Sequence, residues 1–337
     1  MKVVLAGFGA VGRRVAQHLV SDDIVESLIV VHRDPRRVEA EARELGDKVE
    51  LVELVDRRQG NGNGIPSGDV TVLAAPTGSR RVAESAIAQG SHVVSCVDDP
   101  SEVKALLSTD RLARSLNRSI VAGVAMAPGL SCVLAAHMRT KFDSVEEIHV
   151  ASVGTGGPAC AREHHAALSS LSLDWEDGEW RRRPGGSGRE LVWFPEPVGG
   201  ADCYRASLAD ALLLLPAFPG CRRITSRFEA TRRDRMTAWL PMLRRPHPEG
   251  LVGAVRVEMR GWVDGQAETA IFGSAVAPAA AAAVVASRTA LWAGEGRLAR
   301  PGAGGMAEMT PDAALFLKEV GELGVHVSVF EGQPALG

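Results

Sequence analysis

The first 125 residues alternate between short apolar runs and segments of helical periodicity. The runs are rich in Val and Ile and occupy residues 2–7, 27–33, 48–54, 69–76, 92–97 and 119–124. Helical periodicity falls between them, at 11–20, 35–45, 79–89 and 101–116. Strands that alternate with helices in this way form a parallel sheet, because each helix carries the chain back across the sheet. The pattern therefore predicts a doubly wound parallel α/β domain over residues 1–125.

Three glycines follow the first apolar run, in the stretch GFGAVG of residues 7–12. In a nucleotide-binding turn the first glycine allows the sharp bend, the second lets a pyrophosphate approach the backbone, and the third lets helix and strand pack closely. The start of the helix offers free N–H groups to phosphates. Because the motif lies between a predicted strand and a predicted helix, it indicates a Rossmann-type dinucleotide site. We expect the cofactor to contact Gly7, Gly9, Ala10, Val11 and Gly12.

The end of the second apolar run indicates which nucleotide binds. His32 and Arg33 stand at that strand end, and Arg36 follows just beyond it. Cations at this point suit the 2′-phosphate of NADP, whereas an acidic residue would suit the ribose of NAD. We predict NADP as the cofactor; NAD fits instead if Asp34, and not Arg33, faces the ribose.

Two further strand ends belong to the same edge of the predicted sheet. Ala75, Pro76 and Thr77 follow the fourth run, where small residues and proline shape a nicotinamide ribose pocket. Cys96 and Asp98 follow the fifth run, and ligands of open α/β sheets bind at such carboxyl ends. We expect Cys96 to line the cofactor site rather than act as a nucleophile, since no histidine accompanies it locally. Asp98 is a candidate catalytic residue.

The pattern changes from residue 126 onward, where the strand candidates become longer and alternate. They occupy 146–154, 189–195, 221–230, 251–263 and 266–276, with helical segments at 158–171, 207–216 and 234–243. The last two strands are joined by Asp-Gly, a strong hairpin signal. We predict an α+β substrate and dimerisation domain with a mostly antiparallel sheet over 126–276. Its long alternating strands would leave an apolar face or edge to cover, which predicts a homodimer.

The last segment, residues 277–337, contains an Ala-rich helix, a Gly- and Pro-rich turn at 300–309, a helix near 311–323 and a terminal strand at 325–332. A helix made mostly of alanine has little apolar bulk and needs close packing against another element. We expect this segment to return to the Rossmann domain.

The stretch GTGGPACAREHH, residues 154–165, is the densest group of polar residues outside the glycine motif. Gly156 and Gly157 permit close approach to a substrate, and the following helix start suits a carboxylate. His164 or His165 is a candidate for moving the proton that accompanies hydride transfer. Adjacent helical residues point about 100° apart, so one of the two faces the site. Glu163 and the two histidines lack the i, i+4 spacing of metal ligands, and we expect no metal there.

Tyr204, the single tyrosine of the chain, stands next to Arg205. Tyr204 is a candidate acid or orienting residue, and Arg205 is a candidate for binding a substrate carboxylate. The alternative, which we favour, is a half-buried aromatic ring beside a surface arginine.

Three motifs together resemble the saccharopine dehydrogenase-like family. They are an A.P strand end, an A...G.H.V helix and strand, and a G..PG turn into the next domain, here Ala74, Pro76, Ala86, Gly90, His92, Val94, Gly123, Pro128 and Gly129. The likeness covers residues 1–142 well and the second domain in outline. It implies a Rossmann domain, a second domain that closes over the cofactor, and NAD(P)-linked oxidation or reduction at an imine or amine carbon. Some relatives of this group make polyamines.

Composition excludes several other classes of protein. The net charge is −3, so no basic excess points to nucleic acid. Five scattered cysteines without a CxxC pair indicate reduced thiols. The chain enters its first strand without a leader, and no apolar segment is long enough to span a membrane. We expect a cytoplasmic protein that acts on a small molecule.

We therefore predict an NADP-dependent oxidoreductase that acts on CH–NH or CH–OH groups of a small amino-acid- or amine-derived substrate. A transferase that uses bound NAD(P) transiently, as polyamine synthases do, is the first alternative. A non-catalytic NAD(P)-binding sensor or scaffold is the second.

Overall fold

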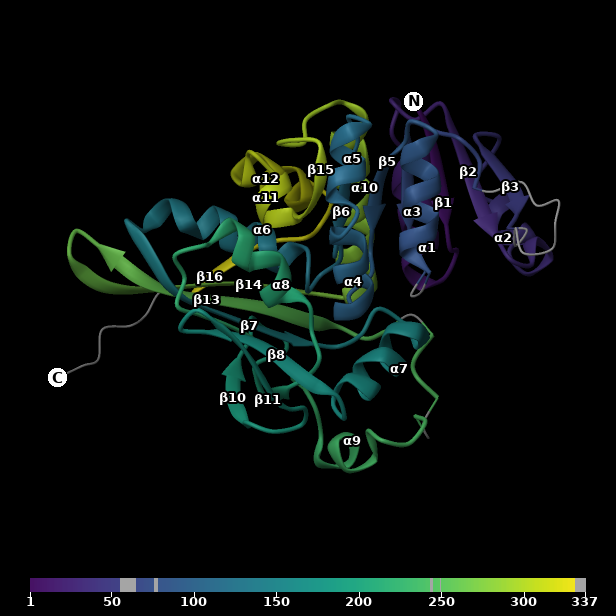
Figure 1. The fold of residues 1–337 in the computed structure, drawn as a ribbon. Coiled ribbons are helices and arrows are strands. Elements are labelled where there is room, and N and C mark those ends of the chain that lie inside the picture. The colour runs from purple at the N-terminus through teal and green to yellow at the C-terminus, as the bar shows by residue number, and fades with distance from the viewer. Residues whose placement is uncertain (55–64, 76–77, 243–244, 249, 331–337) are drawn as a thin grey trace.

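The computed structural model describes residues 1–54, 65–75, 78–242, 245–248 and 250–330. These residues form two sheets with helices packed around them; in Figure 1 the first sheet lies at the upper right and the second below it, toward the left. The predicted fold class, a parallel Rossmann sheet followed by a mostly antiparallel one, is confirmed.

In the described chain the first sheet has seven strands, in the order β15-β6-β5-β4-β1-β2-β3, and every neighbouring pair is parallel. Counted from the other edge, the strand order β3-β2-β1-β4-β5-β6 is that of dinucleotide-binding sheets. In such sheets the direction of winding reverses between the first and fourth strands. Ligands bind outside the carboxyl ends of the strands at that point. The strands are β1 (Lys2–Ala6), β2 (Ser27–His32), β3 (Val49–Glu53), β4 (Val70–Leu73), β5 (His92–Ser95), β6 (Ser119–Ala122) and β15 (Gly302–Gly305).

Helices cover both faces of this sheet (Figure 1). Those from the first 125 residues are α1 (Ala10–Val20), η1 (Pro35–Arg37), α2 (Glu39–Arg43), α3 (Ser79–Ala88), α4 (Pro100–Leu107) and α5 (Asp110–Ser115). The single helix expected at 101–116 is broken into α4 and α5. At the break the hydroxyls of Ser108 and Thr109 bond to the carbonyls of Ala105 and Leu106, which diverts hydrogen bonding from the helical pattern.

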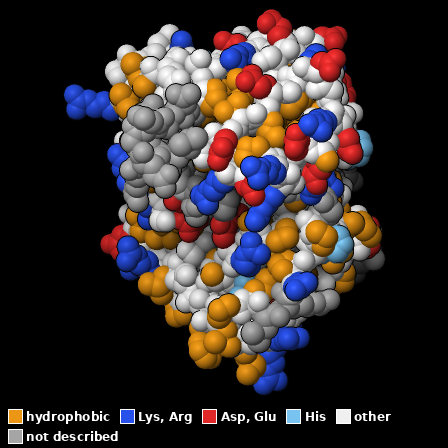
Figure 2. Space-filling model, turned by 90° about the vertical axis from the view of Figure 1, so that its right-hand side faces the viewer, with side chains coloured by type: hydrophobic (Ala, Val, Ile, Leu, Met, Phe, Trp, Pro, Cys, Tyr) orange, Lys and Arg blue, Asp and Glu red, His pale blue; other side chains and the backbone are white. Residues whose placement is uncertain are grey.

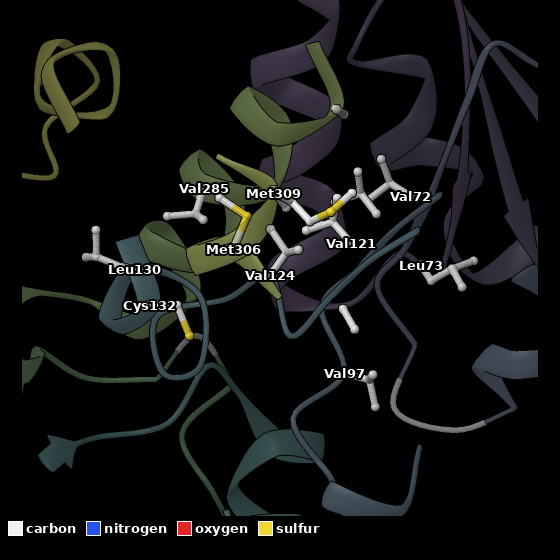
Figure 3. Packing of buried hydrophobic residues seen from close by; sticks show 14 of the residues in the cluster. Val72, Leu73, Val97, Val121, Val124, Leu130, Cys132, Val285, Met306 and Met309 are labelled. Atoms are coloured by element: carbon white, nitrogen blue, oxygen red, sulfur yellow. The ribbon is translucent and has the colours of Figure 1, made fainter. Parts of the chain in front are cut away.

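Strand β15 corrects the expectation of a turn at 300–309. Its sequence, Gly-Ala-Gly-Gly, has low strand propensity, yet all four residues are buried and pair with β6. A Cβ added at Gly305 would lie 2.8 Å from the Leu213 Cβ, so the small residues let the strand fit beside its neighbours. The helix that follows, α11 (Met306–Met309), turns Met306 and Met309 into the core beside Val121, Val124 and Val285 (Figure 3).

The second sheet has nine strands in the described residues and the main order β10-β11-β12-β7-β13-β14-β16. All its pairs are antiparallel except β12 with β7. Its strands are β7 (Ser144–Val153), β8 (Leu171–Glu176), β9 (Glu179–Pro184), β10 (Glu190–Trp193), β11 (Gly200–Arg205), β12 (Arg223–Glu229), β13 (Gly253–Val263), β14 (Gln266–Val276) and β16 (Ser328–Phe330).

Two hairpin turns of this sheet use Asp-Gly. Asp264 and Gly265 have φ angles of 50° and 75°, the combination that a type I′ turn requires. Asp177 and Gly178 repeat it between β8 and β9, a hairpin that our sequence analysis missed. The residues of β9 are mostly exposed, so they show no apolar alternation that would mark a strand.

The remaining helices are α6 (Leu130–Met138), η3 (Arg139–Lys141), α7 (Pro158–Ala167), α8 (Asp210–Leu214), η4 (Leu215–Ala217), α9 (Arg232–Thr237), α10 (Pro278–Gly294) and α12 (Ala313–Glu322). The Ala-rich α10 packs against α1, β4 and β5 of the first sheet. Only part of the C-terminal segment, residues 277–337, returns to the first sheet. Its last strand, β16, pairs with β14 in the second sheet. None of the helices in the described ranges is long and apolar enough to cross a membrane.

Candidate active site

A cavity of about 330 Å³ lies between the two domains. One wall belongs to the first sheet and comes from the glycine loop and the ends of β4 and β5. The opposite wall is the turn after β7 together with the first two turns of α7. The residues that form these two walls include Gly9, Ala10, Val11, Ala75, Cys96, Asp98, Gly156, Gly157, Cys160, Arg162, Glu163 and His164.

The three glycines of the motif differ in what an added side chain would meet. Gly7 has a φ of +104°, and a Cβ there would lie 2.9 Å from the Ala74 carbonyl. A Cβ at Gly12 would lie 2.1 Å from the Gly7 oxygen, which is too close for any side chain. The absence of a side chain at Gly12 therefore lets α1 pack closely against the turn after β1. At Gly9 an added Cβ would meet no described atom within 4 Å. The space in front of Gly9 is therefore open at the start of α1.

The carboxyl end of β2 presents positive charge. Arg33 and Arg36 are exposed, and neither guanidinium has an ion-pair or hydrogen-bond partner among the described residues. Asp34 is held by Arg37 at 3.0 Å. The Nδ1 atom of His32 accepts the Asp34 N–H at 3.1 Å, so His32 shapes the turn. This strand end thus carries two exposed cations beside a carboxylate that is already ion-paired.

The ends of β4 and β5 supply the middle of the cavity. Ala75 and Cys96 line it, whereas Pro76 and Thr77 lie outside the described residues. Burial raises the pKa of the Cys96 thiol to about 12, which keeps the sulfur neutral at physiological pH. Asp99 accepts the N–H groups of Ser101 and Glu102 as the cap of α4, and this fixes the turn that presents Asp98 to the cavity.

The glycine turn after β7 packs directly on the glycine loop of the first domain. A Cβ at Gly157 would lie 2.8 Å from the Ala10 Cβ, and one at Gly156 would lie 3.5 Å from Val11 Cγ2. Pro158 then begins α7 at its first position, where the missing N–H has no cost. The two turns predicted separately from the sequence thus form opposite sides of one site.

His164 occupies the polar end of the cavity and bridges the two domains. Its Nε2 atom lies 2.9 Å from Asp98 Oδ2 and 3.9 Å from Cys160 Sγ. The Phe228 ring packs edge-on against the imidazole at 4.5 Å between centroids. Burial by itself would lower the pKa of His164, but Cys160 and Asp98 outweigh it and hold that pKa well above its ordinary value.

Two other charged residues of α7 line the cavity and were not predicted. Burial, reinforced by the charge of Asp98, raises the pKa of Glu163 to about 7. Arg162 is exposed at the cavity wall. A smaller pocket of about 150 Å³ adjoins the cavity and is lined by Asp98, Asp99, Glu163 and Ser207 among others. The polar wall therefore offers charges of both signs.

Cys160 also escaped our sequence analysis, although its spacing from His164 is i, i+4. The Sγ, Nε2 and carboxylate oxygen of Cys160, His164 and Asp98 all lie within 4.8 Å of one another, close enough to share a metal ion. The triplet considered from the sequence was Glu163 with both histidines, and the structure instead brings His164 together with Asp98 and Cys160. The C-x-x-x-H spacing on α7 is the sequence signal that points to the pair Cys160 and His164.

Three predicted site residues lie away from the cavity. The Nε2 of His165 lies 3.0 Å from the Thr237 carbonyl of α9, because the adjacent position on α7 points to the other side. Tyr204 is buried in a cluster with Phe228 and stacks under the Arg235 guanidinium at 4.1 Å. Arg205 pairs with the buried Asp174 at 3.3 Å. Their positions support structural roles in place of the catalytic and substrate-binding roles expected for them.

Charged side chains on the face shown in Figure 2 lie interspersed, with Lys and Arg next to Asp and Glu. This face therefore presents no broad field of one sign, in keeping with the small net charge of −3.

No protein-family model matches the chain, and no curated protein matches it. Among solved structures, apo saccharopine dehydrogenase (L-Glu forming) from Saccharomyces cerevisiae matches with a TM-score of 0.68 and 14% identity, over 98% of this chain and 100% of that one. GenD2 from gentamicin A biosynthesis, in complex with NAD, matches at 0.48 and 14%, over 98% and 97%. DAP dehydrogenase from C. glutamicum, in complex with DAP, matches at 0.47 and 13%, over 92% and 94%.

The last two matches are too distant to carry an argument, and the first, at 14% identity, establishes the fold alone. It extends over both sheets, including the second domain that the sequence resembled only in outline. The chain therefore shares its two-domain fold with saccharopine dehydrogenase.

Proposed function

We propose that this protein is an NADP-dependent oxidoreductase. It would transfer a hydride between the nicotinamide and a C=N or C=O carbon of a small amine- or amino-acid-derived substrate. The observation that carries this proposal is the shared cavity, which has Gly9, Ala10 and Val11 on one side and the polar start of α7 on the other. Cofactor and substrate would therefore meet in one shared space, as hydride transfer requires.

The residues present fit the cofactor at two points. Gly9 leaves open space at the start of α1 for the pyrophosphate. Arg33 and Arg36 are exposed at the end of β2 and have no partner within the described parts of the chain; the adenosine ribose of a dinucleotide lies at this point in such a sheet order. Their charge favours the additional phosphate of NADP over the bare hydroxyls of NAD.

The cavity also fits the proposed class of substrate. Arg162 offers a cation for a carboxylate, while Asp98, and Glu163 above its pKa of about 7, offer anions for an amino group. The bound nicotinamide would supply the hydride chemistry. The protein's own residues would orient the substrate, exclude water between the two domains, and contact the substrate's oxygen or nitrogen through the group formed by Asp98, Cys160 and His164.

The cofactor assignment is tested by titrating the protein with NADPH and with NADH while following nicotinamide fluorescence. We expect tighter binding of NADPH, and a loss of about 10-fold or more in Arg33→Ala, because a charge-assisted contact to the 2′-phosphate disappears. NADH affinity should be unchanged. Arg111→Ala is the matched control, since Arg111 is exposed on α5 beside β15 and β6, at the other end of the sheet from β2.

Each outcome of this titration decides one part of the proposal. An Arg33→Ala protein that keeps its preference for NADPH would remove the role of Arg33. A wild-type protein that binds neither nucleotide would remove the oxidoreductase proposal altogether.

The homodimer expected from the second sheet also stays a proposal. The edge expected to be open at 251–276 is partly covered, because β16 pairs with Ile271–Gly273 of β14. The opposite end of the described sheet is β10, where Leu191 and Trp193 are 58% and 63% exposed. We expect this edge to lie in the dimer contact. The mass of the protein in solution checks for the dimer, and a monomer at all concentrations contradicts it.

A further inference from the structure

We propose that Asp98, Cys160 and His164 form a binding site for Zn²⁺ at the polar end of the cavity between the two domains. The three residues come from the turn after β5 and from the first turns of α7. Cys160 and His164 are one helical turn apart, so their side chains project from the same face of the helix. The ion would connect the two halves of the molecule.

The arrangement of the three donor atoms distinguishes a metal site from a catalytic relay. In a Cys-His-Asp relay the cysteine and the carboxylate contact different nitrogens of the imidazole. Here both Cys160 Sγ and Asp98 Oδ2 lie closest to the same atom, His164 Nε2. The three donors therefore converge on a common point, which is how side chains are arranged around an ion.

The distances between the donors suit zinc. Tetrahedral coordination by S, N and O donors sets the ligand atoms about 3.3 to 3.6 Å apart. Sγ and Nε2 are 3.9 Å apart and Nε2 and Oδ2 are 2.9 Å apart, while all three pairs lie within 4.8 Å. Small side-chain rotations would bring the atoms to coordination distance.

The donor types also select the metal. Thiolate with imidazole favours Zn²⁺ over Mg²⁺ or Ca²⁺, which prefer oxygen. Binding would release the thiol proton of Cys160 to solvent, since the thiolate is the ligand. Three protein ligands with the fourth position directed to a cavity is the pattern of catalytic rather than structural zinc. In that position the ion would polarise the oxygen or nitrogen of the substrate. This role rests on the proposed function, whereas the binding of zinc does not.

The binding is tested on tag-free protein dialysed against buffer that holds free Zn²⁺ in the nanomolar range. We expect about one zinc per chain by elemental mass spectrometry in the wild type and below about 0.1 in Cys160→Ser, since the loss of a ligand removes most of the affinity. Protein reconstituted with Co²⁺ should show a thiolate-to-cobalt charge-transfer band that Cys160→Ser abolishes.

The chain offers two matched controls. Cys96 lines the same cavity but is absent from the donor group, so Cys96→Ser should keep its zinc and its cobalt band. His165 adjoins His164 and bonds to Thr237 instead, so His165→Gln should keep zinc while His164→Gln loses it. Circular dichroism of each variant establishes that it is folded.

A folded wild-type protein that retains no zinc would overturn the proposal. A cobalt spectrum unchanged by Cys160→Ser would overturn it as well, because the metal would then lie elsewhere. NADPH titration of the same samples separates this result from the proposed function. A protein that binds zinc but neither nucleotide would remove only the oxidoreductase proposal. A protein that binds NADPH but no zinc would remove only the metal site.

Discussion

At the scale of single residues, the glycines of the 7–12 turn differ in what surrounds them, and this separates folding from binding. Gly12 faces the Gly7 carbonyl oxygen, whereas Gly9 faces open space. We expect Gly12→Ala to lower the free energy of unfolding by about 2 kcal/mol or more, because its Cβ meets backbone that side-chain rotation cannot relieve. Urea unfolding checks this value.

Gly9→Ala should behave in the opposite way. Its backbone φ is −86°, which any residue adopts, and we expect a stability change of less than about 1 kcal/mol. NADPH affinity should nevertheless fall at least about 10-fold, because the methyl group occupies the path of the pyrophosphate. Unchanged affinity in Gly9→Ala would contradict the placement of the phosphates.

Asp210 gives the protein a pH dependence of stability. Burial raises the pKa of this carboxyl to about 6, the Ser131 hydroxyl that bonds to it and His164 act to lower the pKa, and the charge of Asp98 acts to raise it. Its pKa is thus higher in the folded than in the unfolded state, so the folded state binds more protons and stability falls as the pH rises toward 6.

Asp210→Asn removes this loss, since the amide does not ionise and its oxygen still accepts the Ser131 hydrogen bond. We expect the variant to gain roughly 2 to 3 kcal/mol over the wild type between pH 4 and pH 7. Denaturant unfolding at several pH values measures the difference, and a difference that does not change with pH would refute the assignment.

At the scale of elements, β15 shows how close packing replaces strand propensity. A Cβ on Gly305 would lie 3.0 Å from the Leu213 carbonyl oxygen. We expect Gly305→Ala to destabilise the protein by about 1 to 3 kcal/mol. Gly321 in α12 is the control, because a Cβ there meets no described atom within 4 Å and alanine favours helix, so Gly321→Ala should stabilise by up to about 1 kcal/mol. Thermal unfolding compares the two, and shifts of the same sign would contradict this account.

The same strand shows why part of the fold could be predicted from the sequence and part could not. Strands β1, β2 and β4 to β6 are almost wholly buried and read as apolar runs. Strand β15 is equally buried but made of small residues, and β9 is exposed and polar, so neither carries a periodic signal. Hydrophobic patterning reveals a strand only where large apolar side chains do the packing.

The candidate site divides in the same way. The glycine turns at 7–12 and 154–157 and the arginines after β2 follow from local sequence, because each forms its geometry within a few residues. The contact of Asp98 with His164 joins residues 66 positions apart in different domains, and only the folded chain reveals it. Cys160 could have been found from its spacing to His164, since helical periodicity places both on one face.

At the scale of the whole molecule, the chain crosses between its two sheets more than once. The first sheet receives β15 from the tail, and the second receives β16. The two domains also meet through Gly157 against Ala10 and His164 against Asp98. A ligand held between the walls of the cavity should therefore affect both domains together.

The measurement that tests this account most directly is amide hydrogen exchange with and without saturating NADPH. We predict slower exchange in two separate segments, the glycine loop at 7–14 and the turn and helix at 154–164, since both line the cavity that would hold the nicotinamide. Protection of the first segment alone would place the reactive end of the cofactor outside the cavity. Protection of neither would contradict the account as a whole.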